Sequence, residues 1–336
     1  MSSVAVDLGS TRTLLADPAG RLLLDEPTVA AVNVRDGSLV TFGSKALDMV
    51  RRAAGEIELV RAVVHGQLQD LELTDRVAET LLTRVRRQVG RRPEVLVSVP
   101  SSASGVQRRA LERAFKRAGA ERVGFVDHAV AAAIGLRLRI DEPVATMVVD
   151  AGGGTTEVAV MALGGVVTDA SVPVGGDDLD RAVRDACLRS LDLVVSPAVA
   201  EQLKIRLGSA WPGPEKKVEV VGRDASNGMV RTVVVSSSEL NPAIAEVVRR
   251  TVDAAVSCIR SAPPDLANDL LSQGLHLAGS AGLLDGYSRR LATATGIPVH
   301  LADQPGLAAV MGAARCLQDS DGAFGPTGDA RPRGSR

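Results

Sequence analysis

Three glycines and two threonines follow a single aspartate within residues 148–160, between two stretches rich in valine. Gly152, Gly153 and Gly154 carry no Cβ atom, so their backbone N–H groups can turn inward together and form a concave site for an anion. Asp150 ends the first stretch, where its carboxylate can hold a metal ion against that anion. The segment predicts a phosphate-binding hairpin. Taken alone it leaves open a glycine-rich turn without a ligand.

The N-terminus repeats this plan. Residues 4–15 run from an apolar strand through Asp7 to a glycine, hydroxyl residues and a second apolar strand. A third strand follows each copy after a turn with glycine, at residues 20–24 and 164–168. Self-similarity on this scale indicates a duplicated domain, in which one hairpin from each half faces a shared cleft.

A third segment, residues 275–284, is a short apolar strand that runs into small residues and then into an amphipathic stretch. Small side chains at the junction of a strand and a helix let a flat ring lie directly against the backbone. The alternative is a tight turn that is packed for its own sake.

In this order, the three segments resemble the nucleotide motifs of the actin-like ATPase superfamily. The resemblance is to its bacterial MreB family and covers nearly the whole chain. Residues 7–10 resemble the first phosphate motif, 149–156 the second, and 278–282 the adenosine motif. Segments outside these motifs distinguish the MreB family from sugar kinases and chaperones: residues 25–29, 99–101, 105–109 and 201–210.

The resemblance implies an α/β, actin-like (ribonuclease H-like) duplicated fold, with two lobes around a nucleotide cleft and a smaller insertion subdomain in each lobe. Residues 1–142 are expected to form lobe I, with a C-terminal helix at 305–318 packing back on it, and residues 143–304 to form lobe II. Residues 319–336 are rich in glycine and proline, which predicts a disordered tail.

Hydrophobic periodicity predicts the elements that such a fold needs. In the first half these are strands at 4–8, 12–16, 21–24, 28–33, 38–42 and 94–99, and helices at 44–54, 73–90 and 104–118. In the second half, after the hairpin that starts at 144, they are helices at 176–190, 197–208, 238–261, 264–271 and 305–317, a β-rich insert at 216–236 and a strand at 274–278.

The resemblance implies ATP and Mg²⁺ as the ligands of the cleft. Magnesium keeps several waters, so Asp7 and Asp150 are expected to hold it through water; the alternative is that each aspartate caps a turn. Hydroxyls of the two hairpins can donate to the phosphates. Residues expected to contact the nucleotide are Asp7, Gly9, Ser10, Thr11, Arg12, Asp150, Gly152, Gly153, Gly154, Thr155, Thr156, Gly176, Asp177, Glu201, Lys204, Gly208, Gly279, Ser280, Ala281 and Gly282.

Two of these assignments have a competing explanation. Glu201 and Lys204 lie one turn apart on a predicted helix, and the resemblance points them at the ribose and adenine, although a solvated ion pair fits the same spacing. Gly176 and Asp177 begin another helix, where an aspartate also serves as an N-cap.

The main departure from the family lies at residues 126–135. His128 and Ala129 stand where the family usually has Glu-Pro, and that glutamate orients the attacking water. Imidazole can accept a proton, but it changes the charge and the reach of the group. Asp127 cannot simply substitute, because one step along a helix turns a side chain by about a quarter turn or slightly more.

With His128 and Asp127 as the candidate catalytic residues, we expect nucleotide binding with slow hydrolysis, or hydrolysis through a different arrangement. The alternative for His128 is a helix N-terminal residue without a catalytic role. Two smaller departures put the affinity in question. Ser280 and Ala281 replace glycines of the adenosine motif, and His65 stands where the family usually has aspartate before Gly66.

Composition narrows the class of protein. With 336 residues, 45% of them hydrophobic, the chain can bury a large core, and a net charge of −1 with 2% aromatic residues argues against a nucleic-acid partner. Three widely spaced cysteines match no zinc or disulfide pattern, which predicts a reducing cytoplasm. No signal peptide and no membrane-spanning run are expected, so the protein is predicted to be cytoplasmic, or peripheral at the inner face of the plasma membrane.

The function that the resemblance implies is a cytoskeletal protein that binds ATP, forms filaments and helps organise cell-wall synthesis and cell shape. Expected partners are further copies of the chain, cell-wall elongation proteins and the inner membrane surface. Four arginines in residues 86–93 could attract anionic headgroups, with a solvated basic turn as the alternative. The alternative functions are a diverged paralogue that acts as a nucleotide-binding scaffold, a small-molecule kinase and a nucleotide-gated chaperone.

Overall fold

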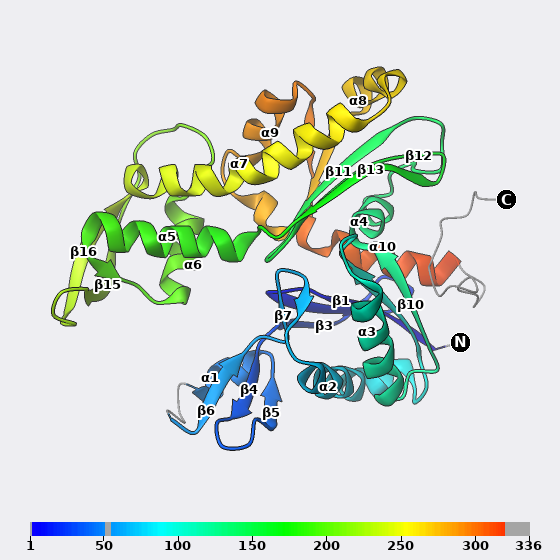
Figure 1. The fold of residues 1–336 in the computed structure, drawn as a ribbon, viewed down its shortest axis with the longest axis horizontal. Coiled ribbons are helices and arrows are strands. Elements are labelled where there is room, and N and C mark those ends of the chain that lie inside the picture. The colour runs from blue at the N-terminus through cyan, green and yellow to red at the C-terminus, as the bar shows by residue number, and fades with distance from the viewer. Residues whose placement is uncertain (1, 51–54, 320–336) are drawn as a thin grey trace.

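Two five-stranded sheets form the bases of the two halves of the molecule (Figure 1). The computed structural model describes residues 2–50 and 55–319. The first sheet has the strand order β10-β9-β1-β2-β3. Its strands are β1 (Ser3–Leu8), β2 (Arg12–Ala16), β3 (Leu22–Pro27), β9 (Glu94–Val99) and β10 (Arg122–Asp127).

The second sheet repeats this plan, with the strand order β13-β12-β11-β17-β18. In each sheet the central strand pairs antiparallel with the strand that follows it in sequence and parallel with a later strand. This repeat confirms the duplication predicted from the two hairpins. The strands are β11 (Thr146–Ala151), β12 (Thr156–Ala162), β13 (Gly165–Val172), β17 (Leu275–Ala278) and β18 (Val299–Leu301).

A smaller insertion extends from each base (Figure 1). The first contains β4 (Ala30–Asn33), β5 (Leu39–Phe42), α1 (Ser44–Val50) and β6 (Ile57–Val60), and is followed by a hairpin of β7 (Val63–Val64) and β8 (Gln67–Leu68). The second contains α5 (Gly176–Leu191), β14 (Leu193–Val194), α6 (Pro197–Leu207), β15 (Lys217–Asp224) and β16 (Val230–Ser236).

The amphipathic helices cover the outer faces of the sheets and form a separate hydrophobic core with each. Helix α3 begins at a capping box, in which Ser104 and Gln107 satisfy each other's backbone N–H groups. Helices of the first half are α2 (Leu71–Val89) and α3 (Gly105–Arg117). Those of the second half are α7 (Ser237–Ser261), α8 (Ala267–Gln273) and α9 (Tyr287–Thr295), with 3₁₀ turns at Pro264–Leu266, Ser280–Leu283 and Pro305–Leu307.

Helices α4 (His128–Gly135) and α10 (Ala308–Asp319) cross between the two halves. Helix α10 packs on the first sheet, whereas α4 also contacts β11 and β12 of the second. The crossing brings backbones into contact, since a Cβ atom on Gly135 would lie 1.9 Å from the Ala308 carbonyl oxygen. Glycine is required there because no side chain fits.

The structure departs from the sequence-based prediction mainly in short elements. Strands β6, β7, β8, β14 and β18 were not predicted, because runs this short carry a weak periodic signal. Strand β10 and helix α9 are longer and were not predicted either. The last helix begins at Ala308 rather than 305, since Pro305 and Gly306 form a 3₁₀ turn first. Asp319, expected in the tail, ends α10. The rest of the predicted tail and the predicted helical residues 51–54 lie outside the described residues.

In the part of the chain that the structure describes, no helix is long and apolar enough to cross a bilayer.

Candidate nucleotide site between the two halves

The two glycine hairpins face each other across the gap between the halves. Each is closed by the same bond: Gly9 N–H donates to the Arg12 carbonyl at 3.1 Å, and Gly152 N–H donates to the Thr155 carbonyl at 2.9 Å. A Cβ atom on Gly154 would lie 2.4 Å from the Ser10 hydroxyl oxygen. The loops therefore touch, and bare backbone at the contact is what brings both sets of N–H groups to one place.

Gly153 makes the matching contact with the other hydroxyl residue of the first loop. A Cβ atom there would lie 2.0 Å from the Thr11 Oγ1 atom. Behind the second loop, Gly176 N–H donates to the Gly152 carbonyl at 3.0 Å, and Asp177 N–H donates to the Gly153 carbonyl at 2.8 Å. Backbone N–H groups at the start of α5 thus bind the carbonyl groups of the second loop.

The two aspartates of the hairpins lie on the central strands and share one partner; Asp150 is buried and Asp7 is mostly buried. The His128 side chain lies with Nδ1 3.9 Å from an Asp7 carboxylate oxygen and Nε2 3.4 Å from an Asp150 carboxylate oxygen. Burial would lower the pKa of His128, but the charges of Asp7 and Asp150 outweigh it and raise that pKa to about 10. The place between two carboxylates thus favours the charged imidazole, whereas burial raises the pKa of Asp7.

A further carboxylate, Glu157 on β12, joins the halves near this cluster. It is 1% exposed and accepts hydrogen bonds from the Ser171 hydroxyl at 2.7 Å and the Ser101 backbone N–H at 3.3 Å. Burial raises its pKa, while the bond from Ser171 and the charge of His128 act in the opposite direction. Glu157 carries no sequence signal of this role, because its partner Ser101 belongs to the other half.

A small cavity of about 50 Å³ lies beside the first phosphate loop. Its walls include Asp7, Ser10, Gly66, His128 and Thr155. Most of the lining surface is apolar, and the volume is large enough for a water molecule. The arrangement places a water-sized space next to the predicted phosphate loops and His128.

The donor set fits a nucleotide better than a directly ligated magnesium ion. The paired glycine loops bring their backbones close together, where a Cβ atom on Gly153 or Gly154 would collide with the first loop. Asp7 and Asp150 are oxygen ligands of the kind that Mg²⁺ prefers. The His128 imidazole, however, lies against both carboxylates, so an ion held directly by the pair does not fit beside it. Among the described residues, no group of three or more His, Cys, Asp or Glu side chains could hold a metal.

Several predicted contact residues line the side of α5 and α6. Lys204 pairs with Asp180 at 2.9 Å, and its Nζ atom would lie 3.8 Å from a Cβ atom on Gly176. Glu201, one turn earlier, is exposed. Gly208 ends α6 and is buried, and a Cβ atom there would lie 2.9 Å from Ile244, which gives this glycine a packing role.

The predicted adenosine motif lies behind the second phosphate loop. Gly279 has a φ of +79°, and a Cβ atom there would lie 2.1 Å from the Ala151 carbonyl oxygen. The 3₁₀ turn Ser280–Leu283, which contains Ala281 and Gly282, continues from it. Arg12 of the first loop reaches the same region, since a Cβ atom on Gly306 would lie 3.3 Å from its guanidinium and 3.5 Å from Ser280 Cβ. These contacts bring the three predicted motifs together.

Three predicted site residues have other partners in the structure. The Thr156 hydroxyl is buried and donates to the Val174 carbonyl at 2.8 Å. Asp127 accepts a bond from Arg108 at 2.7 Å, which separates it from the buried cluster of His128. Asp177 pairs with Arg61 at 2.7 Å.

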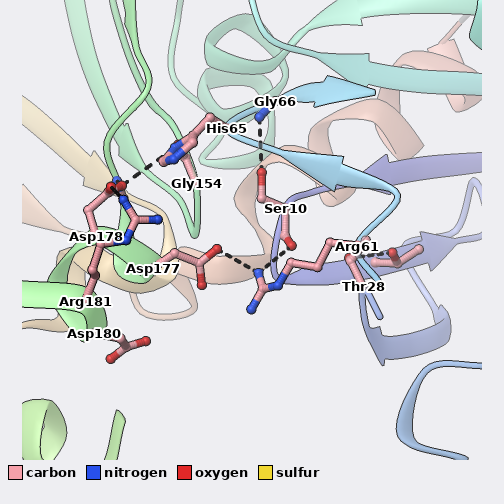
Figure 2. A network of polar contacts seen from close by, with 12 residues as sticks. Ser10, Thr28, Arg61, His65, Gly66, Gly154, Asp177, Asp178, Asp180 and Arg181 are labelled. Atoms are coloured by element: carbon pink, nitrogen blue, oxygen red, sulfur yellow. Dashed lines mark hydrogen bonds and ion pairs between the residues drawn. The ribbon is translucent and has the colours of Figure 1, made fainter. Parts of the chain in front are cut away.

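Arg61 is the main residue that the sequence analysis missed (Figure 2). Its Nη1 atom also donates to the Ser10 carbonyl at 2.9 Å, so it contacts the first phosphate loop as well as α5. His65 was noted only as a departure from the family; it contacts the carbonyl of Gly154. A lone arginine in a β-rich segment carries no signal of such a role, because its partner Asp177 is 116 positions away.

Comparison with known proteins relates this geometry to a family. A family profile described as MreB/Mbl protein matches residues 1–323. The cell shape-determining protein MreB of Escherichia coli (strain K12) is 36% identical over 327 residues, covering 95% of this chain and 94% of that protein.

Two solved structures share the fold. A crystal structure of MreB5 of Spiroplasma citri bound to ADP has a TM-score of 0.87 and 25% identity, and covers 94% of this chain and 98% of its own. The MamK double helical filament has a TM-score of 0.79 at 18% identity, covering 94% and 99% of the two chains, which is a likeness of fold alone. These likenesses confirm the α/β, actin-like duplicated fold with two lobes around a cleft.

Proposed function

The chain belongs to the MreB/Mbl family, and from this premise we propose that it is an actin-like cytoskeletal protein. It binds ATP between its two lobes, self-associates into filaments, and helps organise cell-wall synthesis and cell shape. The observation that carries the proposal is the contact of the two glycine hairpins, in which Gly153 and Gly154 leave no room for a Cβ atom beside Thr11 and Ser10. The likeness to MreB5 bound to ADP supports a nucleotide as the ligand.

Residues of both lobes bind the nucleotide in this proposal. Backbone N–H groups of residues 10–12 and 153–155 face the phosphates, joined by the hydroxyls of Ser10, Thr11 and Thr155. Lys204 and Glu201 lie on the side of the ribose and adenine, and Gly279 with the turn after it lies against the base. ATP supplies the phosphoanhydride bond and the charge that draws the lobes together. Binding energy then favours a closed conformation that polymerises.

Hydrolysis is slow in this proposal because His128 is a poor base. A group whose pKa is about 10 already carries its proton at neutral pH and cannot take one from water. The cavity beside Asp7 and His128 is the proposed place of the attacking water. The protein would thus be a nucleotide-binding member of its family with little turnover.

Magnesium accompanies the triphosphate in the proposal and is held through water by Asp7 and Asp150. Two cations, Mg²⁺ and the His128 imidazolium, then share the same carboxylates. Like charges repel at short range, so the imidazolium weakens the binding of Mg²⁺. We therefore expect the nucleotide affinity to depend less on magnesium than it would if Asp7 and Asp150 had no other cation beside them.

The protein is proposed to act in the cytoplasm, at the inner face of the plasma membrane. Arg86, Arg87, Arg91 and Arg92 are all exposed around the turn between α2 and β9. Each exposed arginine near an anionic surface contributes about 1 kcal/mol. Co-sedimentation with liposomes that contain anionic lipid, against neutral liposomes, tests this location, and elongation proteins of the cell wall are the proposed partners there.

Electron microscopy of the purified protein with ATP, with ADP and without nucleotide tests the function. Filaments that form with ATP and not without nucleotide are the expected result. A protein that stays monomeric under all three conditions while it phosphorylates a metabolite would instead be a kinase of the same superfamily.

A further inference from the structure

The hairpin of β7 and β8 projects from the first lobe toward the second phosphate loop and α5 (Figure 1). Its two turn residues, His65 and Gly66, have φ values of 48° and 71°, which suits a tight two-residue hairpin. A Cβ atom on Gly66 would lie 2.9 Å from Pro100 and 3.0 Å from the Thr155 methyl group. The tip is therefore wedged between the end of β9 and the second phosphate loop.

Arg61, just before this hairpin, ties three segments together (Figure 2). Its Nη1 atom donates to the Ser10 carbonyl at 2.9 Å and to the Asp177 carboxylate at 2.7 Å. Ser10 belongs to the first phosphate loop and Asp177 to the start of α5 in the second lobe. One side chain thus holds a phosphate loop and crosses the cleft.

His65, at the tip, makes the corresponding contacts with the second phosphate loop (Figure 2). Its Nδ1 atom lies 2.8 Å from the Gly154 carbonyl oxygen and 3.7 Å from an Asp178 carboxylate oxygen. A carbonyl only accepts, so Nδ1 carries the proton in this bond. The neighbouring Gly66 N–H donates to the Ser10 hydroxyl at 3.1 Å. The hairpin tip therefore contacts both phosphate loops at once.

The acidic start of α5 gives the Arg61 contact an electrostatic role. Asp177, Asp178 and Asp180 all lie in the first turns of the helix. Burial raises the pKa of Asp177, and the charge of Arg61 lowers it. Without the guanidinium, an uncompensated carboxylate would face the place where the phosphates bind, and like charges repel.

We propose that the β7–β8 hairpin is a clasp across the nucleotide cleft, in which Arg61 and His65 are positioning residues that hold the two phosphate loops together and set the rate of nucleotide release. This rests on the proposed nucleotide binding. Nucleotide release then requires the contacts of Arg61 and His65 with the second lobe to open, because both join the lobes beside the phosphate loops.

Stopped-flow dissociation of a fluorescent ATP analogue, chased with excess ATP, measures the clasp. Arg61→Met and His65→Val are each expected to release the analogue about tenfold faster, the factor that about 1.4 kcal/mol produces. Arg35→Met is the matched control, because Arg35 is exposed on the β4–β5 turn of the same lobe. It is expected to release the analogue at the wild-type rate.

Conservative variants separate positioning from loss of structure. The Asn amide nitrogen can replace the histidine Nδ1 donor, so His65→Asn is expected to restore most of the slow release that His65→Val loses. The double variant Arg61→Met with Asp177→Asn is expected to release nucleotide no faster than Arg61→Met alone, because both changes remove the same interaction. Independent additive effects of the two would overturn the pairing.

Hydrogen–deuterium exchange in the absence of nucleotide tests the clasp independently of nucleotide binding. Residues 8–13 and 152–156 are expected to exchange faster in Arg61→Met and His65→Val than in the wild type. If the wild type binds no nucleotide, the proposed function fails, and this exchange still decides whether the clasp exists. Unchanged exchange, or release rates equal to the wild type in both variants, would overturn the clasp.

Discussion

At the scale of single residues, the cleft depends on the charge of His128. His128 lies between Asp7 and Asp150, so a cation that belongs to the chain itself is present where two carboxylates would otherwise repel each other. Removing one partner of a buried ion pair destabilises the folded protein strongly, because the other charge then stays buried without compensation. The imidazolium therefore stabilises the cleft before any ligand arrives.

This pairing predicts a pH-dependent stability. The folded pKa of His128, about 10, lies above its ordinary value of 6.5. A raised histidine pKa stabilises the folded state fully below about pH 6.5, and that contribution is lost as the pH rises through about 10. Without nucleotide, His128→Asn should lower the unfolding free energy at pH 6 by about 3–5 kcal/mol.

Melting temperatures of the wild type and His128→Asn between pH 6 and pH 10.5 check this prediction. The difference between the two should shrink steadily above neutral pH. A difference that stays constant over the whole range would mean that His128 is uncharged in the folded protein.

The same charge predicts the effect of replacing His128 with a carboxylate. His128→Glu places an acceptor beside the water-sized cavity, and general-base catalysis contributes about 10²–10⁴-fold in enzymes. Steady-state phosphate release should therefore rise at least about tenfold in His128→Glu with magnesium present. Nucleotide affinity, measured in parallel by calorimetry, controls for changes in binding. Equal turnover in the two proteins would show that position 128 does not limit hydrolysis.

At the scale of elements, the crossing of α4 and α10 connects the two lobes. A Cβ atom on Gly312 would lie 1.7 Å from the Ala131 carbonyl oxygen, and Arg315 donates to the Ile134 carbonyl at 2.7 Å. One side of the crossing packs on the first sheet and the other on the second. Any change in the helix spacing is therefore transmitted to both lobes.

Gly312→Ala tests this crossing, because two effects of opposite sign compete. Helix propensity alone would stabilise the variant by about 1 kcal/mol. The backbone contact forces the helices apart, and overpacking costs about 1–3 kcal/mol. A distance of 1.7 Å to a backbone atom leaves no room to relax by a rotamer change, so we expect net destabilisation.

Gly213→Ala is the control for that substitution, since a Cβ atom there meets no atom within 4 Å. Thermal unfolding should place Gly312→Ala below the wild type and Gly213→Ala at or slightly above it. A higher melting temperature for Gly312→Ala would contradict the close crossing.

Elements with a local sequence signal could be predicted, whereas contacts that depend on tertiary packing could not. The glycine hairpins and the long helices α2, α5 and α7 could be predicted, because their signals lie within a few neighbouring residues. The β7–β8 hairpin has two-residue strands and carried no such signal. The contact of Arg61 with Asp177 depends on the meeting of two lobes, and the partners that Asp127 and Thr156 take depend on tertiary packing in the same way.

At the scale of the whole molecule, each lobe has its own hydrophobic core. One large core lies among the strands and helices of the second lobe, and another lies in the first. Specific polar contacts join the lobes, such as that of Ser101 with Glu157. A ligand that touches both phosphate loops therefore stabilises the assembly of the lobes as well as each loop.

ATP should accordingly raise the melting temperature of the whole molecule. A ligand at one hundred times its dissociation constant stabilises by about 2.7 kcal/mol. For a protein of 336 residues that corresponds to about 4 °C. In Gly154→Ala the added Cβ atom would lie 2.4 Å from the Ser10 hydroxyl oxygen and 3.1 Å from the His65 backbone nitrogen, so the loops cannot meet. We expect this variant to lose more than half of the shift.

Gly165→Ala, on the same sheet, is the matched variant because its Cβ atom would lie 3.8 Å from the nearest atom, the Ala162 carbonyl oxygen. It should keep the full ATP-dependent shift. Scanning calorimetry with and without magnesium ATP makes the comparison. If Gly154→Ala gains as much from ATP as the wild type does, the two hairpins do not bind one ligand together, because their contact would then be dispensable for binding.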